Sequence, residues 1–75
     1  MKQHQYHVTV QHLADAQGNP SSYTEKLEFN TSNHDDIFIV LDRLQKAELF
    51  DDATTKSFTV GLKLLSEVML ENKNH

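Results

Sequence analysis

The clearest periodic pattern in the sequence lies in its last third, where apolar residues recur at intervals of four, three and four positions. This spacing places side chains on one face of an α-helix, so we expect a helix over about residues 52–72. The stripe consists of Phe58, Leu62, Leu65 and Met69, and Val60, Leu64 and Val68 widen it. A fold for this chain must therefore accommodate a long helix that carries more apolar surface than one neighbouring element usually covers.

Gly61 lies within this expected helix. A glycine inside a helix costs about 1 kcal/mol relative to alanine, so its presence calls for a packing reason. We interpret Gly61 as a point where another element approaches the helix backbone closely.

A second helical pattern precedes the first, over about residues 34–48. Its apolar positions are Ile37, Val40, Leu41 and Leu44. Asp35 and Asp36 stand where carboxylates meet the free amides and the positive dipole of a first turn, so the helix is expected to start near His34. Residues 37–41 alone would also fit a buried strand, which periodicity does not separate from a helix. The capping residues and the polar residues that follow favour the helix.

Two runs of alternating apolar and polar residues come before the helices. The first covers residues 6–13 and the second residues 23–30, and residues 16–22 between them contain the only proline and one of the two glycines. The inner faces would carry Tyr6, Val8, Val10 and His12 on the first run and Tyr23, Leu27 and Phe29 on the second. Residues 30–33 are rich in turn-forming side chains and are expected to break the second strand. The pattern predicts an antiparallel hairpin over about residues 4–30, with one apolar face.

Together these elements predict an α+β fold in the order β-β-α-α, with an antiparallel hairpin packed against two helices in a single domain of residues 1–75. Domains of this size often gain stability from disulfides, from metals or from self-association. The chain has no cysteine, which excludes disulfides. We therefore expect a homodimer, in which the outer flank of the second helix, near Leu64 and Val68, is the contact.

Charge and hydropathy narrow the classes of partner. The formal net charge is −4, and one arginine and six lysines are scattered along the chain. Nucleic acid is not an expected partner, because phosphate binding needs clustered cations. The N-terminal residues are polar, and no apolar run approaches the length that crosses a membrane. These features predict a cytoplasmic protein without a membrane partner.

The five histidines raise the possibility of a metal site. His4 and His12 share a strand face, but they lie about 26 Å apart at the rise of a strand, which is too far for one ion. His34 with Asp35 and Asp36 is the densest group of potential ligands. Residues at a helix start serve as caps more often than as ligands, so no metal ligand and no cofactor is predicted here.

The sequence supports a catalytic site even less than a metal site. Asp51 and Asp52 could form a carboxylate pair for acid–base chemistry, but that chemistry needs one raised pKa and a concave pocket, and their context favours a solvated helix cap. Tyr6 and Tyr23 could line a ligand site, although packed rings with solvated hydroxyls are the preferred interpretation. The serines lie in loop, cap or helix contexts without a nucleophile elbow. They are Ser21, Ser22, Ser32, Ser57 and Ser66.

Three segments of the sequence resemble a known family. Residues 7–15, residues 33–38 and the run from Gly61 to Leu70 together are similar to the small bacterial proteins grouped as domain of unknown function 3861. That family has no assigned activity, substrate or catalytic residue, so the resemblance carries no chemistry to this chain. It implies a stand-alone bacterial cytoplasmic protein.

No catalytic residue is predicted, and an enzymatic activity stays an open alternative. The expected function is a non-enzymatic protein-interaction or regulatory module that acts through its surface. The alternative is a small-molecule or metal-binding protein whose site lies at a dimer interface, where two chains form a pocket that one cannot enclose.

Overall fold

The structure is a computed structural model that describes residues 2–73. Two strands are followed by two helices, β1 (His4–Val10), β2 (Leu27–Asn33), α1 (Ile37–Ala47) and α2 (Asp52–Glu71). The strands pair antiparallel, with His4 opposite Asn33 and Val10 opposite Leu27. The predicted α+β fold and its element order are confirmed.

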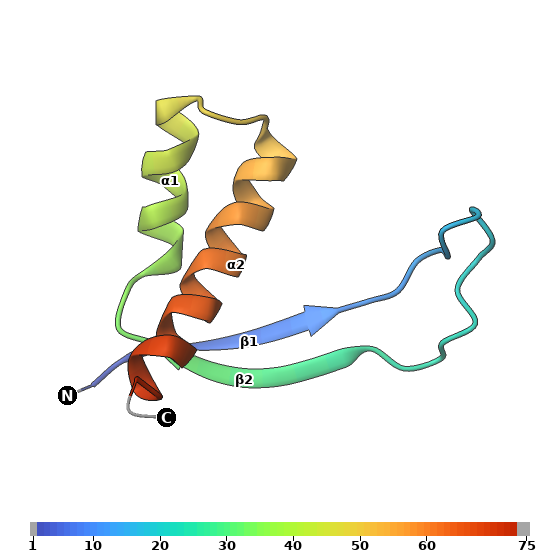
Figure 1. The fold of residues 1–75 in the computed structure, drawn as a ribbon, viewed down its shortest axis with the longest axis horizontal. Coiled ribbons are helices and arrows are strands. Elements are labelled where there is room, and N and C mark those ends of the chain that lie inside the picture. The colour runs from blue at the N-terminus through green and yellow to red at the C-terminus, as the bar shows by residue number, and fades with distance from the viewer. Residues whose placement is uncertain (1, 74–75) are drawn as a thin grey trace.

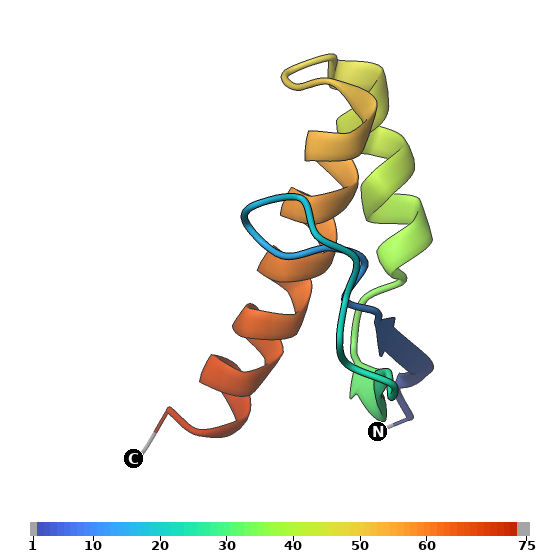
Figure 2. The same ribbon diagram turned by 90° about the vertical axis from the view of Figure 1, so that its right-hand side faces the viewer.

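The two helices lie side by side and stand over one end of the hairpin, the end at which β1 begins and β2 finishes (Figure 1). The rest of the hairpin and the connection of residues 11–26 project away from them as an arm. Viewed along the arm, the hairpin lies at the base of the helix pair (Figure 2). The molecule measures 44 × 32 × 22 Å, and its radius of gyration of 15.0 Å exceeds the ~11 Å expected for a compact domain of this length. The chain is therefore extended.

The second strand differs from the sequence-based prediction at both ends. The prediction that residues 30–33 break the strand is wrong, because these residues pair with residues 4–7 of β1. Cross-strand pairing overrides the turn preference of asparagine and serine there. Tyr23 lies outside β2, and β1 ends at Val10 instead of continuing to Leu13. Residues 11–26 form local turns, in which the Asp15 carboxylate accepts hydrogen bonds from the backbone amides of Gln17 and Asn19.

The first helix starts at Ile37, three residues later than expected. Asp36 is its N-cap and accepts hydrogen bonds from the amides of Phe38 and Ile39. His34 and Asp35 lie before the cap, so the prediction that the helix starts near His34 is wrong. The alternative of a buried strand over residues 37–41 is also wrong. The helix ends at Glu48, which adopts the left-handed conformation with φ of 55°.

The second helix has the expected extent. Asp51 is the predicted N-cap and accepts a hydrogen bond from the Thr54 amide at 2.7 Å. Thr55 and Thr59 are buried in the half of α2 that lies beside α1 (Figure 1). The Thr59 hydroxyl donates to the Thr55 carbonyl at 2.7 Å, which satisfies a buried polar group inside the helix.

The apolar core of this protomer is small. Among the described residues only one apolar side chain, Ile37, is buried. The other buried side chains are polar, namely Asn33, Thr55, Thr59 and Glu67. A chain with so small a core buries little apolar surface. Because burial of apolar surface is the main favourable contribution to folding, the stability of this chain alone is expected to be low.

Candidate interaction surface

A buried asparagine joins the hairpin to α2. The Asn33 side chain is fully buried, and its amide nitrogen donates to the carbonyl of Lys63 at 2.9 Å. Its amide oxygen accepts a hydrogen bond from the backbone amide of Asp35 at 2.9 Å. One side chain therefore satisfies backbone groups of two separate segments and fixes the angle between the end of β2 and α2.

A buried glutamate strengthens the same junction. Glu67 of α2 is 4% exposed, and its carboxylate accepts a hydrogen bond from the backbone amide of His34 at 2.9 Å. Nδ1 of the His34 ring lies 3.1 Å from the same carboxylate, and Gln3 donates to it at 3.3 Å. Because a buried carboxylate is costly unless it is hydrogen-bonded, these contacts explain how the fold tolerates Glu67.

Asp35 and Lys63 complete the network on its outer side. Lys63 Nζ lies 2.5 Å from the Asp35 carboxylate, and Nε2 of His34 lies 3.5 Å from it. The hydrogen bond from Lys63 is the main cause that lowers the pKa of Asp35 below its ordinary value. His34, Asp35 and Glu67 thus hold the helices on the hairpin, and the capping role that the sequence suggested belongs to Asp36 alone.

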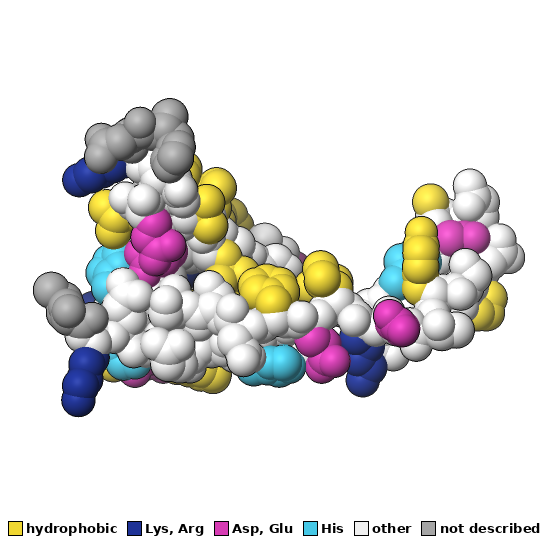
Figure 3. All heavy atoms as spheres, turned by 90° about the horizontal axis from the view of Figure 1, so that it is seen from below, with side chains coloured by type: hydrophobic (Ala, Val, Ile, Leu, Met, Phe, Trp, Pro, Cys, Tyr) yellow, Lys and Arg dark blue, Asp and Glu magenta, His cyan; other side chains and the backbone are white. Residues whose placement is uncertain are grey.

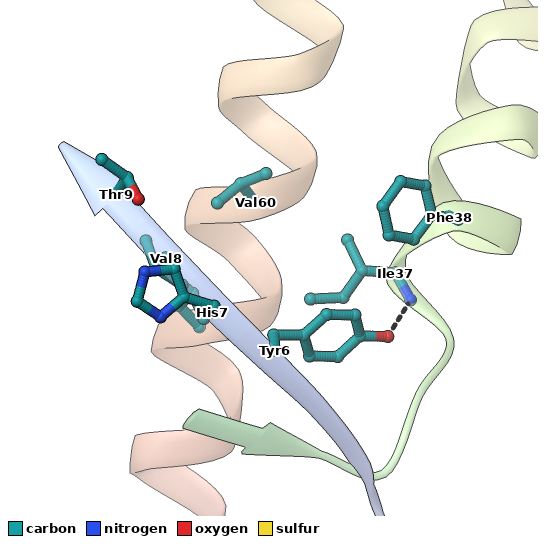
Figure 4. A pocket seen from close by; sticks show the side chains of 8 residues that line it. Tyr6, His7, Val8, Thr9, Ile37, Phe38 and Val60 are labelled. Atoms are coloured by element: carbon teal, nitrogen blue, oxygen red, sulfur yellow. Dashed lines mark hydrogen bonds between the residues drawn. The ribbon is translucent and has the colours of Figure 1, made fainter. Parts of the chain in front are cut away.

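Tyr6 fastens α1 to β1. Its hydroxyl donates to the Asp35 carbonyl at 3.0 Å and accepts from the Ile37 amide at 2.8 Å, the contact drawn in Figure 4. The interpretation of a solvated hydroxyl is therefore wrong for Tyr6. Tyr23 lies exposed in the arm. Its ring is perpendicular to that of His12, and the two ring centroids are 5.1 Å apart.

An open apolar cleft lies between β1 and the two helices (Figure 4). Its volume is about 280 Å³. The lining residues are Tyr6, His7, Val8, Thr9, Ile37, Phe38, Val60 and Leu64. Leu64, which the sequence placed on an outer flank, therefore faces this cleft. The volume lies just under the ~300 Å³ at which ligand pockets begin, so one chain offers a shallow apolar groove.

Outside the cleft, apolar side chains cover much of the surface. They gather over the helices and along one edge of the projecting arm in Figure 3. On α2 they include Phe58, Leu62, Leu65, Val68 and Met69, and on the hairpin and its connection Val10, Leu13, Tyr23, Leu27 and Phe29. Exposed apolar patches of such extent are typical of interaction sites.

Gly61 lies on this exposed side of α2. A Cβ atom built at Gly61 would meet no atom within 4 Å. The prediction that another element of the chain approaches Gly61 closely is therefore wrong. Within residues 2–73, no contact requires glycine at this position.

The aspartate pair that could have served acid–base chemistry is held in its charged form. Hydrogen bonds from Thr54 lower the pKa of Asp51, and the hydrogen bond from Lys56 is the main cause that lowers the pKa of Asp52. Asp52 also accepts a hydrogen bond from Gln45 at 2.9 Å, which links the two helices. Both shifts are opposite to the raised pKa that a general acid needs.

His7, His12 and His34 each have their own polar partners. Nδ1 of His7 lies 2.7 Å from Asn30 Oδ1, and its Nε2 lies 3.3 Å from Glu28 Oε1. Both contacts raise the pKa of His7, and the contact with Asn30 contributes most. His12 contacts Ser21 in the arm, and His75 lies outside the described residues. Within residues 2–73, no group of three or more His, Asp or Glu side chains is arranged to hold a metal ion.

The sequence analysis missed the residues that organise this junction, which are Asn33, Lys63 and Glu67. A signal for two of them was present, because Lys63 and Glu67 are four residues apart on the polar side of the predicted helix.

No described helix is both long enough and apolar enough to cross a membrane.

Two comparisons with known proteins return a similar sequence or fold. The family model of DUF3861, a domain of unknown function with solved structure, matches residues 4–75. The crystal structure of a protein of unknown function from Pectobacterium atrosepticum SCRI1043 is 32% identical in sequence and has a TM-score of 0.80. The similarity covers 99% of this chain and 77% of that one. No curated protein matches the sequence.

Proposed function

The chain belongs to the DUF3861 family, and we propose that it is a non-enzymatic protein-interaction or regulatory module that works as a homodimer. The observation that carries this proposal is the large accessible surface of the protomer. It measures 6387 Å², whereas a compact monomer of 8.6 kDa exposes about 4,700 Å².

The excess of about 1,700 Å² has the size of an interface. A standard protein–protein interface buries about 800 Å² on each partner, and obligate homodimers bury more. Covering this excess with a second copy would bring the chain to the exposure of an ordinary folded protein. The apolar character of the exposed α2 residues supports the same conclusion, because obligate interfaces resemble a divided core.

The described titratable groups support a module without catalysis. Asp36 and Asp51 cap helices, while Asp35, Lys63 and Glu67 hold the helices on the hairpin. Each of these charged groups has a structural task that accounts for its position.

We also infer that the module works in the bacterial cytoplasm. The relative of known structure comes from a bacterium, and the chain has no cysteine with which to form the disulfides that are common in secreted small domains.

The apolar cleft favours one alternative function. In a dimer, a second chain could close the open side of the groove between Val8 and Leu64 and form a pocket for an apolar small molecule. A metal-binding site at the dimer interface remains the other form of this alternative.

Light scattering after gel filtration at tens of micromolar tests the proposal. We expect a mass of about twice the 8.6 kDa of one chain. Native mass spectrometry of the same sample separates the two functions: a dimer without added mass supports the module, and a dimer with a stoichiometric small molecule or ion supports the alternative. A parent protein that stays monomeric at millimolar concentration contradicts both.

A further inference from the structure

The outward side of α2 carries no charge along most of its length. Between Thr54 and Asn72 the helix has four charged residues, and at 3.6 residues per turn all of them lie within one arc, centred on Glu67. They are Lys56, Lys63, Glu67 and Glu71. The opposite half of the helix carries only apolar residues, glycine, serine, threonine and asparagine. A helix face in permanent contact with water normally carries charged side chains, so this face is unusual for a solvated surface.

The apolar residues on that side have the spacing of a helix-pairing seam. We call Phe58, Leu62, Leu65 and Met69 the α2 seam. Intervals of four, three and four residues are those of the a and d positions of a coiled coil, which pack against a second helix of the same spacing. The chain leaves the seam partly uncovered. Leu65 is 59% and Met69 63% exposed, whereas Leu62 is 42% exposed and Phe58, whose ring lies against Phe50, is 44% exposed.

Gly61 lies beside the seam, one turn from Phe58 and from Leu65. Glycine is unfavourable inside a helix, and no contact among the described residues compensates for it here, because a Cβ at this position would meet open space. The separation of two packed helices depends on the side chains at their contact, so a helix that crosses at Gly61 can approach more closely than elsewhere.

We propose that α2 pairs antiparallel with α2 of a second copy, around a twofold axis between Leu62 and Leu65. This inference rests on the proposed function and names the surface through which it operates. The seam is self-complementary in this arrangement, because Phe58 of each copy lies opposite Met69 of the other and Leu62 lies opposite Leu65.

Charge favours the antiparallel direction. The N-terminal end of α2 carries Asp51 and Asp52, and Lys73 follows its C-terminal end. Antiparallel pairing brings the acidic end of one helix near the lysine of the other and opposes the two helix dipoles. Parallel pairing would place the acidic ends together.

Two substitutions test the seam by light scattering. Leu65→Glu should convert the dimer to a monomer at tens of micromolar. Leu13→Glu changes a leucine at the end of the arm that is more exposed than Leu65 (75% against 59%), and it should leave the mass unchanged. Gly61→Leu should weaken the dimer at least tenfold, although leucine is the better helix former. If both α2 variants remain dimeric at concentrations where the parent does, the seam is wrong while the proposed dimer stands.

A distance measurement on the intact dimer tests the direction without disturbing the seam. The chain has no cysteine, so Asn72→Cys can carry a single spin label on each copy. Antiparallel pairing about the stated axis predicts a separation on the order of 25 Å, and parallel pairing predicts roughly 10 Å. The shorter distance would overturn the antiparallel seam, and a monomeric parent would instead overturn the proposed function itself.

Discussion

The carboxylate of Glu67 accepts a hydrogen bond from the backbone amide of His34 at 2.9 Å, although the two residues lie 33 positions apart in the sequence. This contact ties the C-terminal half of α2 to the turn that joins β2 to α1. Together with Asn33 it sets where α2 lies, and therefore which side of α2 faces outward.

Removing the Glu67 side chain should destabilise the protein. In Glu67→Ala the backbone amide of His34 loses its charged acceptor, which we expect to lower the free energy of unfolding by about 1–3 kcal/mol. Glu71→Ala, one turn further along α2 and exposed, is the matched control and should change it by less than about 0.5 kcal/mol. Urea denaturation measures both. An equal, small effect of the two variants would show that Glu67 does not hold the junction.

The ion pair between Asp35 and Lys63 should make stability depend on pH. The pKa of Asp35 is lowered in the folded protein relative to its ordinary value of 3.8. Its ionised form therefore stabilises the fold fully at pH values above 3.8, and this stabilisation is lost as pH falls through the lowered pKa. Asp15, Asp51 and Asp52 have lowered pKa values too and contribute with the same sign.

Lys63→Met isolates the contribution of Asp35. The melting temperature of this variant, followed from about pH 6 to about pH 2.5, should start lower than that of the parent and fall less steeply. Parallel curves for parent and variant would show that the ion pair adds nothing to the pH dependence.

The hydroxyl of Tyr6 should stabilise the attachment of α1. Tyr6→Phe leaves the Ile37 amide without its acceptor, and we expect a loss of about 1–2 kcal/mol in the free energy of unfolding. Tyr23→Phe changes a ring that is exposed in the arm and should be neutral within about 0.5 kcal/mol. Thermal melts of the two variants side by side decide the point, and identical curves would refute the role given to Tyr6.

The N-cap of α2 should contribute measurably. Asp51→Ala removes the acceptor of the Thr54 amide and should cost about 1 kcal/mol, while Asp51→Ser, which keeps a capping oxygen, should restore most of that loss. Chemical denaturation checks the pair. If serine does no better than alanine, the carboxylate acts through the helix dipole and not as a cap.

The order of elements could be predicted from the sequence because local signals agree with the fold. The alternation in β1, the capping aspartates Asp36 and Asp51 and the stripe of α2 each depend on residues close in the chain. The junction could not be predicted, since Asn33 and Glu67 owe their burial to partners about thirty residues away. Asn33 also belongs to a run that would form a turn if it were not paired with β1.

The sequence also could not show which element, if any, packs against Gly61. From the sequence we expected glycine there to have a packing reason within the same chain, and that prediction is wrong. None of residues 2–73 lies over Gly61, so the close approach would come from the second copy in the proposed seam. The same applies to the width of the apolar stripe, which the hairpin and α1 leave largely uncovered.

If a second copy completes the fold, as we propose, the melting temperature must depend on protein concentration. Folding coupled to dimerisation makes the melting temperature rise with concentration, because mass action favours the associated state. We predict a continuous rise from about 1 μM to about 1 mM, with a single cooperative transition throughout. A melting temperature that stays constant over this range, with the mass of one chain, would show that the chain folds without a second copy.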